Sequence, residues 1–190
     1  GGVGKTTTTI NLAASIADRG YRVLIVDIDP QGNATSGLGI EKSEIYQDIY
    51  NVLIDEIPIQ DTIHHTSTPK LDMVPATINL SGAETELISM MARETRLKSA
   101  LDAISDQYDF VFIDCPPSLG QLSINAFTAS DSILIPVQSE YYAMEGLSQL
   151  LNTIRLVQKH FNKDLGVEGV LLTMLDARTN LGAEVVKDCL

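Results

Sequence analysis

Short runs of apolar residues recur along the chain and alternate with longer stretches whose apolar residues repeat at helical spacing. The runs are apolar at almost every position, which is typical of strands covered on both faces of a parallel sheet. We predict strands at residues 21–27, 71–75, 110–114, 132–137 and 167–173. We predict helices at residues 7–17, 82–105, 122–129 and 143–160. This alternation predicts an α/β fold, in which a doubly wound and mostly parallel sheet carries helices on both faces.

Residues 41–69 carry a weaker pattern. We expect a helix around residues 45–53 and a short amphipathic piece near residues 57–65. His64 and His65 are interpreted as surface residues, because nothing nearby in the sequence offers a metal partner. The chain shows neither an internal repeat nor a low-complexity linker, so residues 1–190 are expected to form a single domain.

The composition limits the possible partners. The 190 residues are 44% hydrophobic, which is enough for one sizeable core, and the formal net charge is −12. Such acidity argues against a generic nucleic-acid coat, which needs clustered Lys and Arg. Any DNA binding would depend on a local basic cluster, and a solvated helix face is the alternative interpretation of each candidate. The candidates are Arg93, Arg96 and Lys98, then Arg155, Lys159 and Lys163, and Arg178 alone.

The cysteines and the hydropathy pattern favour a cytoplasmic protein. Cys115 and Cys189 have neither a metal-ligand spacing nor a disulfide framework, and we interpret them as reduced thiols. No stretch of the sequence approaches the apolar length that spans a bilayer, and no signal segment is visible.

A glycine-rich segment opens the chain and runs directly into a helical pattern. Its residues are Gly1, Gly2, Val3, Gly4, Lys5, Thr6 and Thr7. Glycines let consecutive backbone N–H groups turn toward phosphate oxygens, and the N-terminus of the following helix attracts the same anion. Lys5 adds a positive charge for the β- and γ-phosphates, and the Thr6 hydroxyl suits a Mg²⁺ ligand position. We interpret the segment as a phosphate-binding loop rather than a glycine-rich turn that happens to precede a helix.

Carboxylates follow two of the predicted strands. Asp27 and Asp29 come at the end of the first strand, and Asp114 ends the strand at residues 110–114. Ligands of such sheets bind beyond the carboxyl ends of the strands, so we expect the three carboxylates to converge on the loop that holds Lys5. The polar segment 27–33 is a candidate nucleotide-sensing switch, and Asp114 a candidate Mg²⁺-holding carboxylate. Turn formation is the alternative role of a strand-end aspartate.

One expected feature is missing at the start of the sequence. A phosphate-binding loop normally follows a buried apolar strand, and its usual pattern has a further glycine five positions before Gly4. The sequence begins at Gly1 with neither, and it ends at Leu190 inside a helical pattern. We therefore expect one P-loop ATPase domain, truncated at both ends, that lacks its first strand and its C-terminal part.

Several ordered motifs resemble one known family. They are Gly-Gly-Val-Gly-Lys-Thr-Thr at 1–7, Asp-Ile-Asp-Pro-Gln-Gly-Asn-Ala-Thr at 27–35 and Asp-Cys-Pro-Pro-Ser-Leu-Gly at 114–120. Residues 140–147 and 171–180 continue the likeness, which covers essentially the whole chain. The chain resembles the deviant Walker-A ATPases of the ParA/Soj type, in the ParA/MinD superfamily, which partition chromosomes and plasmids.

The resemblance implies an ATP site with Mg²⁺ as its metal. It implies that Lys5 contacts the β- and γ-phosphates, that Thr6 binds Mg²⁺ and that Thr7 contacts the α-phosphate. The family's signature lysine would stand immediately before Gly1. In the family that lysine reaches the partner subunit's nucleotide. Residues 1–190 alone are therefore expected to be poor both at dimerisation and at ATP hydrolysis.

The resemblance also assigns the acidic residues and one arginine. Asp29 resembles the residue that positions the attacking water, Asp114 the one that holds Mg²⁺ through water, and Asp27 a supporting carboxylate of the same switch. This agrees with the needs of phosphoryl transfer, which are mainly positioning and charge neutralisation. Arg178 falls where the family carries a basic residue used in ATP-dependent, sequence-nonspecific DNA binding.

The resemblance implies a cycle of assembly. ATP binding would form a homodimer that pools basic residues for nonspecific binding to nucleoid DNA, and a ParB/Spo0J-type partner would stimulate hydrolysis and release. The alternative is a MinD-like membrane-cycling ATPase, although no basic amphipathic run lies within the 190 residues. A nitrogenase-reductase-like protein is disfavoured because it needs paired cysteines, and a non-hydrolysing scaffold because Lys5, Thr6, Asp29 and Asp114 are intact.

Overall fold

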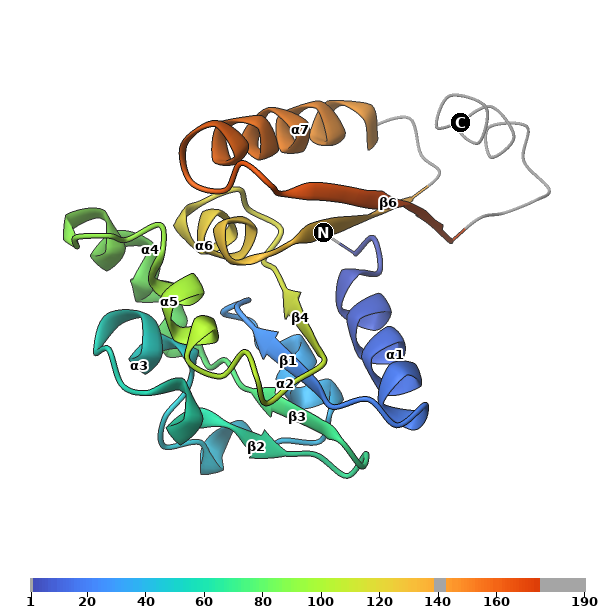
Figure 1. Cartoon of the computed structure of the whole chain (residues 1–190), viewed down its shortest axis with the longest axis vertical. Helices are drawn as coiled ribbons and strands as arrows, with labels where there is room; N and C mark the ends of the chain where they lie inside the picture. The colour runs from blue at the N-terminus through green and yellow to red at the C-terminus, as the bar shows by residue number, and fades with distance from the viewer. Residues whose placement is uncertain (1, 139–142, 175–190) are drawn as a thin grey trace.

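The computed structural model describes residues 2–138 and 143–174 (Figure 1). Its strands are β1 (Val23–Asp27), β2 (His64–His65), β3 (Leu71–Val74), β4 (Phe110–Asp114), β5 (Ser132–Gln138) and β6 (Gly166–Thr173). Its α-helices are α1 (Lys5–Asp18), α2 (Asn33–Gly37), α3 (Ile49–Ile54), α4 (Ala83–Glu86), α5 (Arg96–Asp102), α6 (Gln121–Ala129) and α7 (Ala143–His160). Short 3-10 turns are η1 (Lys42–Glu44), η2 (Ile59–Thr62), η3 (Ile78–Gly82) and η4 (Leu87–Ser89).

The strands form two sheets that are parallel at every pair except one. The larger sheet has the order β2-β3-β1-β4, and β5 pairs with β6 in the smaller one. β1 runs parallel to β3 and β4, whereas the two-residue β2 is antiparallel to β3. The predicted α/β fold with a mostly parallel sheet is confirmed, and each of the five predicted strands is present within two residues of its expected bounds.

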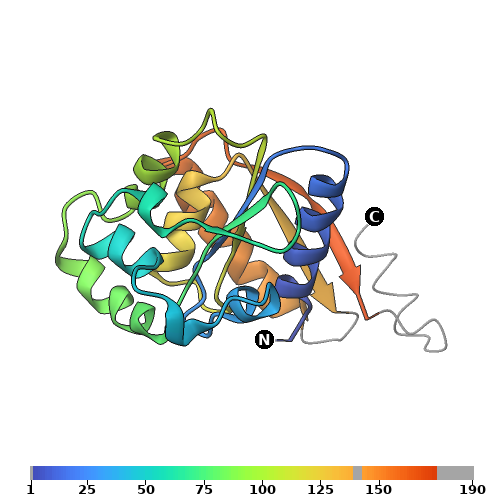
Figure 2. The ribbon, with the colours of Figure 1, turned by 90° about the horizontal axis from the view of Figure 1, so that it is seen from below.

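Helices cover both faces of the larger sheet, with β1 at the centre of the core. All five residues of β1 are buried. On one face α1 packs against β1, β3 and β4 through small side chains such as Ala13 and Ala17 (Figures 1 and 2). The other face packs against a larger apolar cluster from α3, α5, α6 and α7, which includes Leu53, Leu97 and Leu122. Burial on both faces is the reason why β1 is apolar at every position before Asp27.

An apolar cleft separates the two sheets. It is a cavity of about 1400 Å³ between β4 and β5, and residues of α1 and α6 also line it. Phe110 and Val111 on β4 and Leu134 on β5 are each more than a third exposed along it, whereas the residues of β1 that pair with Phe110 and Val111 are fully buried. The outer edges of β4 and β5 therefore face one another across an apolar space.

The predicted helix at 82–105 is wrong as a continuous element. The structure breaks it into η3, α4, η4 and α5, with Met90 extended and Ala92 in a left-handed conformation at φ 51°. Asn125 of α6 explains the break, because its side-chain oxygen accepts from the Leu97 N–H at 3.2 Å and its amide donates to the Arg93 carbonyl at 2.7 Å. A side chain from another helix thus accepts one N–H of the first turn of α5 and holds the carbonyl of a residue just before it.

The segment at 41–69 also differs from its prediction. The helix expected around 45–53 begins only at Ile49, where Asp48 caps it by accepting the Tyr50 N–H at 2.8 Å. The expected piece near 57–65 consists of η2 and of the edge strand β2. His65 on β2 is exposed and its Nδ1 lies 2.7 Å from Asp72 Oδ1, so it is a surface residue as expected.

Candidate nucleotide-binding site

The glycine-rich loop ends where α1 begins. Gly2 and Gly4 have φ of 85° and 86°, a left-handed conformation that favours glycine. Gly4 precedes the first helical residue, and its carbonyl accepts the Thr8 N–H at 2.9 Å. Lys5, Thr6 and Thr7 therefore occupy the first turn of α1, where the free N–H groups and the helix dipole attract an anion. Gly1 lies outside the described residues.

The first turn of α1 meets the end of β4. The Thr6 hydroxyl donates a hydrogen bond of 2.7 Å to Asp114 Oδ2, although 108 residues separate the two. Asp114 is buried, and its other oxygen, Oδ1, has no hydrogen-bond partner among the described residues. Buried carboxylate oxygens are normally hydrogen-bonded, so this oxygen is suited to accept a ligand that comes from outside the protein. The pair leaves one acceptor of Asp114 for a group that the protein does not supply.

Groups from α1 and from the segment after β1 act on the charge of Asp114. Burial raises the pKa of Asp114, whereas the Thr6 hydrogen bond and the positive charge of Lys5 lower it and the negative charge of Asp29 raises it. Lys5 and Asp29 therefore act on the same carboxylate, as the predicted convergence of these residues requires. Burial also raises the pKa of the neighbouring Cys115 thiol to about 12, in keeping with an unreactive thiol.

Asp27 lies inside the protein and organises the loop that follows it. Its Oδ1 accepts the Asp29 N–H at 3.1 Å, and its Oδ2 accepts both the N–H and the hydroxyl of Thr35, at 2.9 and 2.8 Å. Burial raises the pKa of Asp27 to about 6, against the lowering effect of these hydrogen bonds. Both of its oxygens are occupied by the loop itself, so Asp27 supports the switch segment from within.

The segment from Asp29 to Gly32 is held in a tight turn. Asp29 is 8% exposed, and its Oδ1 accepts the Gln31 N–H at 2.9 Å. Gly32 adopts φ 58°, and a Cβ on it would lie 2.6 Å from the Ala76 carbonyl oxygen. Only glycine fits this position, so Asp29 is presented from a turn of fixed shape.

The positioning roles of Thr35 and Glu84 could not be predicted from the sequence. Thr35 is fully buried, and its hydroxyl accepts the Ala76 N–H at 3.0 Å while it donates to Asp27. Glu84 of α4 accepts the Gln121 N–H at 2.6 Å and so caps α6, the helix that follows the loop 114–120. Thr35 ends the motif at 27–35, but nothing in the sequence shows that its hydroxyl bonds Asp27, and Glu84 is only a carboxylate in a helical pattern.

The residues present fit a Mg²⁺–nucleotide. The first turn of α1 offers free N–H groups and Lys5 for phosphates, and the Thr6 hydroxyl with the unpartnered Asp114 Oδ1 offers the oxygen ligands that Mg²⁺ prefers. Within residues 2–138 and 143–174, no cluster of three His, Cys, Asp or Glu side chains could bind a metal alone.

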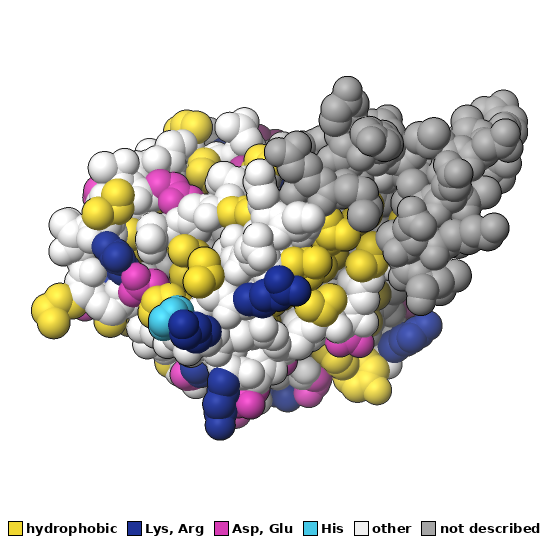
Figure 3. Space-filling view, turned by 90° about the horizontal axis from the view of Figure 1, so that it is seen from above, with side chains coloured by type: hydrophobic (Ala, Val, Ile, Leu, Met, Phe, Trp, Pro, Cys, Tyr) yellow, Lys and Arg dark blue, Asp and Glu magenta, His cyan; other side chains and the backbone are white. Residues whose placement is uncertain are grey.

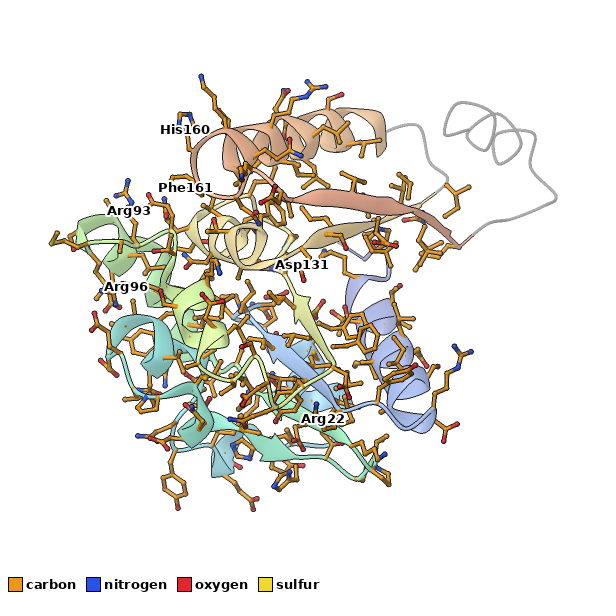
Figure 4. All side chains as sticks on the ribbon, in the orientation of Figure 1. Arg22, Arg93, Arg96, Asp131, His160 and Phe161 are labelled. Carbon is orange, nitrogen blue, oxygen red and sulfur yellow. The ribbon has the colours of Figure 1, made fainter. Side chains whose placement is uncertain are left out.

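The Lys and Arg residues that the sequence offers as candidate DNA contacts do not form one continuous basic surface among the described residues. Arg93 pairs with Glu94 at 2.7 Å, Arg96 with Glu56 at 2.7 Å, and Lys98 with Asp102 at 2.8 Å. Figure 4 shows Arg93 and Arg96 beside α4 and α5, and Arg22 at the other end of the sheet from the phosphate-binding loop. Each charge of the first cluster is therefore paired within the protein, and the Arg96 side chain is only 13% exposed, so the three residues do not form a free basic patch.

The remaining candidates lie on α7 or outside the described residues. No ion pair of Arg155, Lys159 or Lys163 occurs in the part of the chain that the structure describes. The space-filling view over α7 shows Lys and Arg as separate spots, several of them beside Asp or Glu, and not as one basic patch (Figure 3). Arg178 falls within 175–190, which the structure does not describe. No helix in the described ranges is long and apolar enough to cross a membrane.

A parallel α/β sheet with a glycine-rich loop, a Thr–Asp pair and a carboxylate-lined edge defines a P-loop nucleotide triphosphatase. The model of a family described as an AAA domain matches residues 1–167. The chain is 64% identical to the sporulation initiation inhibitor protein Soj of Bacillus subtilis, over 99% of this chain and 74% of that protein. It is 55% identical to the chromosome partitioning protein ParA of Myxococcus xanthus, over 99% of this chain and 66% of that protein.

A solved structure shows the same fold with a ligand. It is described as cobyrinic acid a,c-diamide synthase from Mycobacterium smegmatis with bound ADP and magnesium, and its TM-score is 0.94 at 39% identity. The match covers 99% of this chain and 76% of that one. The chain belongs to the ParA/Soj-type ATPases of the ParA/MinD superfamily, as the sequence motifs predict.

Proposed function

We propose that this protein is an ATPase that drives the segregation of chromosomes or plasmids. The observation that carries the proposal is the Thr6–Asp114 hydrogen bond of 2.7 Å, with Asp114 Oδ1 left unpartnered beside the first turn of α1. A Mg²⁺–nucleotide is the ligand that such a pair accommodates in a P-loop protein. The similarity to partitioning proteins supports DNA segregation as the cellular process, in preference to a MinD-like membrane-cycling role.

The ligands of the site are ATP and Mg²⁺. Gly1, Gly2, Val3 and Gly4 supply the backbone of the phosphate cradle, Lys5 neutralises the β- and γ-phosphates and Thr7 contacts the α-phosphate. Thr6 would hold Mg²⁺ directly, and Asp114 would hold it through water. When bound, the metal neutralises charge on the phosphate oxygens.

The catalytic residues of the proposal are Lys5, Asp29 and Asp114. The fixed turn from Asp29 to Gly32 keeps the Asp29 carboxylate near Asp114 and Lys5, where it can orient a water toward the terminal phosphate. Asp27 acts indirectly, because its two oxygens hold the backbone of the same turn. Hydrolysis would thus depend on positioning and charge, with no covalent intermediate.

The cellular cycle needs partners. ATP binding would form a homodimer, and the dimer would bind nonspecific DNA on the nucleoid in the cytoplasm through basic residues that include Arg178. Pairing two subunits doubles the phosphate contacts, so a modest basic surface gains affinity even on a chain of net charge −12. A ParB/Spo0J-type DNA-binding protein would stimulate hydrolysis and so release the dimer.

The apolar cleft between β4 and β5 supports the expected domain organisation. One further strand, parallel to both neighbours, would join the two sheets and cover the exposed Phe110, Val111 and Leu134. We propose that the strand leading into the phosphate-binding loop fills this cleft in the complete protein, so that residues 1–190 belong to one P-loop domain.

The test of the function is DNA binding by the complete protein across a salt series, in ATP, in ADP and without nucleotide. We expect binding to random-sequence DNA in ATP only, with an affinity that falls steeply as salt rises. Equal binding in all three states would contradict an ATP-dependent switch. ATP hydrolysis without DNA binding in any state would instead favour the membrane-cycling alternative, which binding to liposomes would then test.

A further inference from the structure

Thr173, the last residue of β6, contacts the phosphate-binding loop. Its hydroxyl lies 2.8 Å from the Val3 carbonyl oxygen and 3.3 Å from the Val137 carbonyl oxygen on β5. Its methyl group lies beside Gly4, where a Cβ would be 3.6 Å from it. A single side chain of the smaller sheet therefore touches two consecutive residues of the loop, directly before Lys5.

The geometry of the peptide unit gives this contact a consequence. The Val3 carbonyl and the Gly4 N–H belong to one planar trans peptide, so they point in opposite directions. A hydroxyl that holds the carbonyl on one side aims the Gly4 N–H to the other side. Gly4 at φ 86° has little steric preference of its own, so the orientation of this peptide needs an external contact.

We propose that Thr173 is a positioning residue for the phosphate-binding loop, because its hydroxyl fixes the Val3–Gly4 peptide with the N–H toward the phosphates. The inference rests on the proposed nucleotide site and adds a residue from β6 to it. It gives the smaller sheet a direct connection to the nucleotide, 170 residues along the chain from Val3.

The Val137 carbonyl, as a second acceptor for the Thr173 hydroxyl, limits how much ATP affinity depends on the contact with Val3. A threonine hydroxyl has one proton, and the shorter distance assigns it to Val3, with Val137 as the alternative acceptor. If the loop moves, the Thr173 hydroxyl can rotate and donate its hydrogen bond to the Val137 carbonyl instead, so it keeps an acceptor. The contact therefore biases the loop without locking it, which predicts a moderate loss of affinity on its removal.

The experiment compares Thr173→Val and Thr173→Ser in the complete protein with the wild type. Valine keeps the shape and removes the donor, so we expect the KM for ATP to rise about fivefold to tenfold while kcat changes less than about twofold. Serine keeps the donor and should restore the KM to within about twofold of the wild type. Thr153→Val is the matched control, since the Thr153 hydroxyl donates to the Gln149 carbonyl within α7 at 3.1 Å.

The outcomes separate this inference from the function on which it rests. A wild-type protein that binds no ATP would overturn the proposed function itself. A wild type that binds ATP, with a Thr173→Val KM within twofold of it, would overturn the inference alone. Equal impairment of the serine and valine variants would also overturn the inference. So would a loss in the free energy of unfolding of nucleotide-free Thr173→Val, measured in urea, that is as large as its loss in the free energy of ATP binding, because the effect would then be a general loss of packing.

Discussion

The Thr6 hydroxyl donates to Asp114 Oδ2 at 2.7 Å and so joins the first turn of α1 to the carboxyl end of β4. The hydrogen bond brings together the two residue types that hold Mg²⁺ in P-loop proteins. The partner of Asp27 in the β1–β4 register is Asp114 itself, so strand pairing alone sets the two carboxylates side by side. The sheet therefore positions the side chain that we propose for Mg²⁺ binding, and α1 supplies its hydroxyl partner.

Replacing Asp114 by Asn tests this pair. The amide lacks the charge that favours Mg²⁺, so we expect ATP hydrolysis in the complete protein to fall at least about a hundredfold. ATP binding measured in EDTA should change by less than about threefold, because the phosphate contacts of the loop and Lys5 remain. An equal loss of ATP affinity with and without Mg²⁺ would contradict a metal-directed role for Asp114.

Replacing Asp29 by Ala separates catalysis from binding. The variant keeps the loop glycines, Lys5 and Thr6, so it should bind ATP normally, lose turnover by at least about a hundredfold and remain on DNA in ATP. Single-turnover hydrolysis and DNA release after ATP chase would measure both. Normal turnover would remove Asp29 from the catalytic residues.

Asp27 predicts a pH dependence of stability. Its pKa of about 6 in the folded protein lies above the ordinary value of 3.8, so the folded state favours the protonated form. The stabilisation is complete below about pH 4 and is lost as the pH rises through 6, and it is on the order of 3 kcal/mol. The Asp27→Asn side chain does not titrate in this pH range. Its amide group also places an N–H donor where a carboxylate oxygen accepted the N–H of Asp29 or Thr35.

Urea unfolding of the nucleotide-free protein measures this effect. We expect Asp27→Asn to be destabilised by about 1–3 kcal/mol at pH 7.5, because buried donors lose acceptors, and by more at pH 4.5. A difference between wild type and variant that stays constant from pH 4.5 to 7.5 would show that Asp27 has an ordinary pKa.

Much of this site follows from the sequence, because strand ends in a parallel sheet meet at one edge. Asp27, Asp29 and Asp114 come together for that reason. The role of Thr35 could not be predicted, since its hydroxyl bonds the Ala76 N–H, and the loop after β3 reaches it only once the fold has formed. Apolar spacing also cannot show the break before α5, which depends on Asn125 from another helix.

Arg178→Glu tests the proposed DNA contact. The change should weaken DNA binding in ATP at least about tenfold and flatten the salt dependence, while basal ATP hydrolysis stays within about twofold. Arg19→Glu changes the net charge equally at the exposed C-terminal end of α1, outside every candidate DNA-binding cluster, and is the matched control. If both variants lose the same affinity, the effect is one of overall charge, and Arg178 has no specific role.

The most direct test of the account is calorimetric titration of ATP with Mg²⁺ into the complete protein and its Lys5→Ala variant. Lys5 stands in the first turn of α1 and acts on Asp114, so its removal should eliminate measurable ATP binding while the protein stays folded. Unchanged ATP affinity in Lys5→Ala would contradict the assignment of residues 1–7 as the phosphate-binding loop.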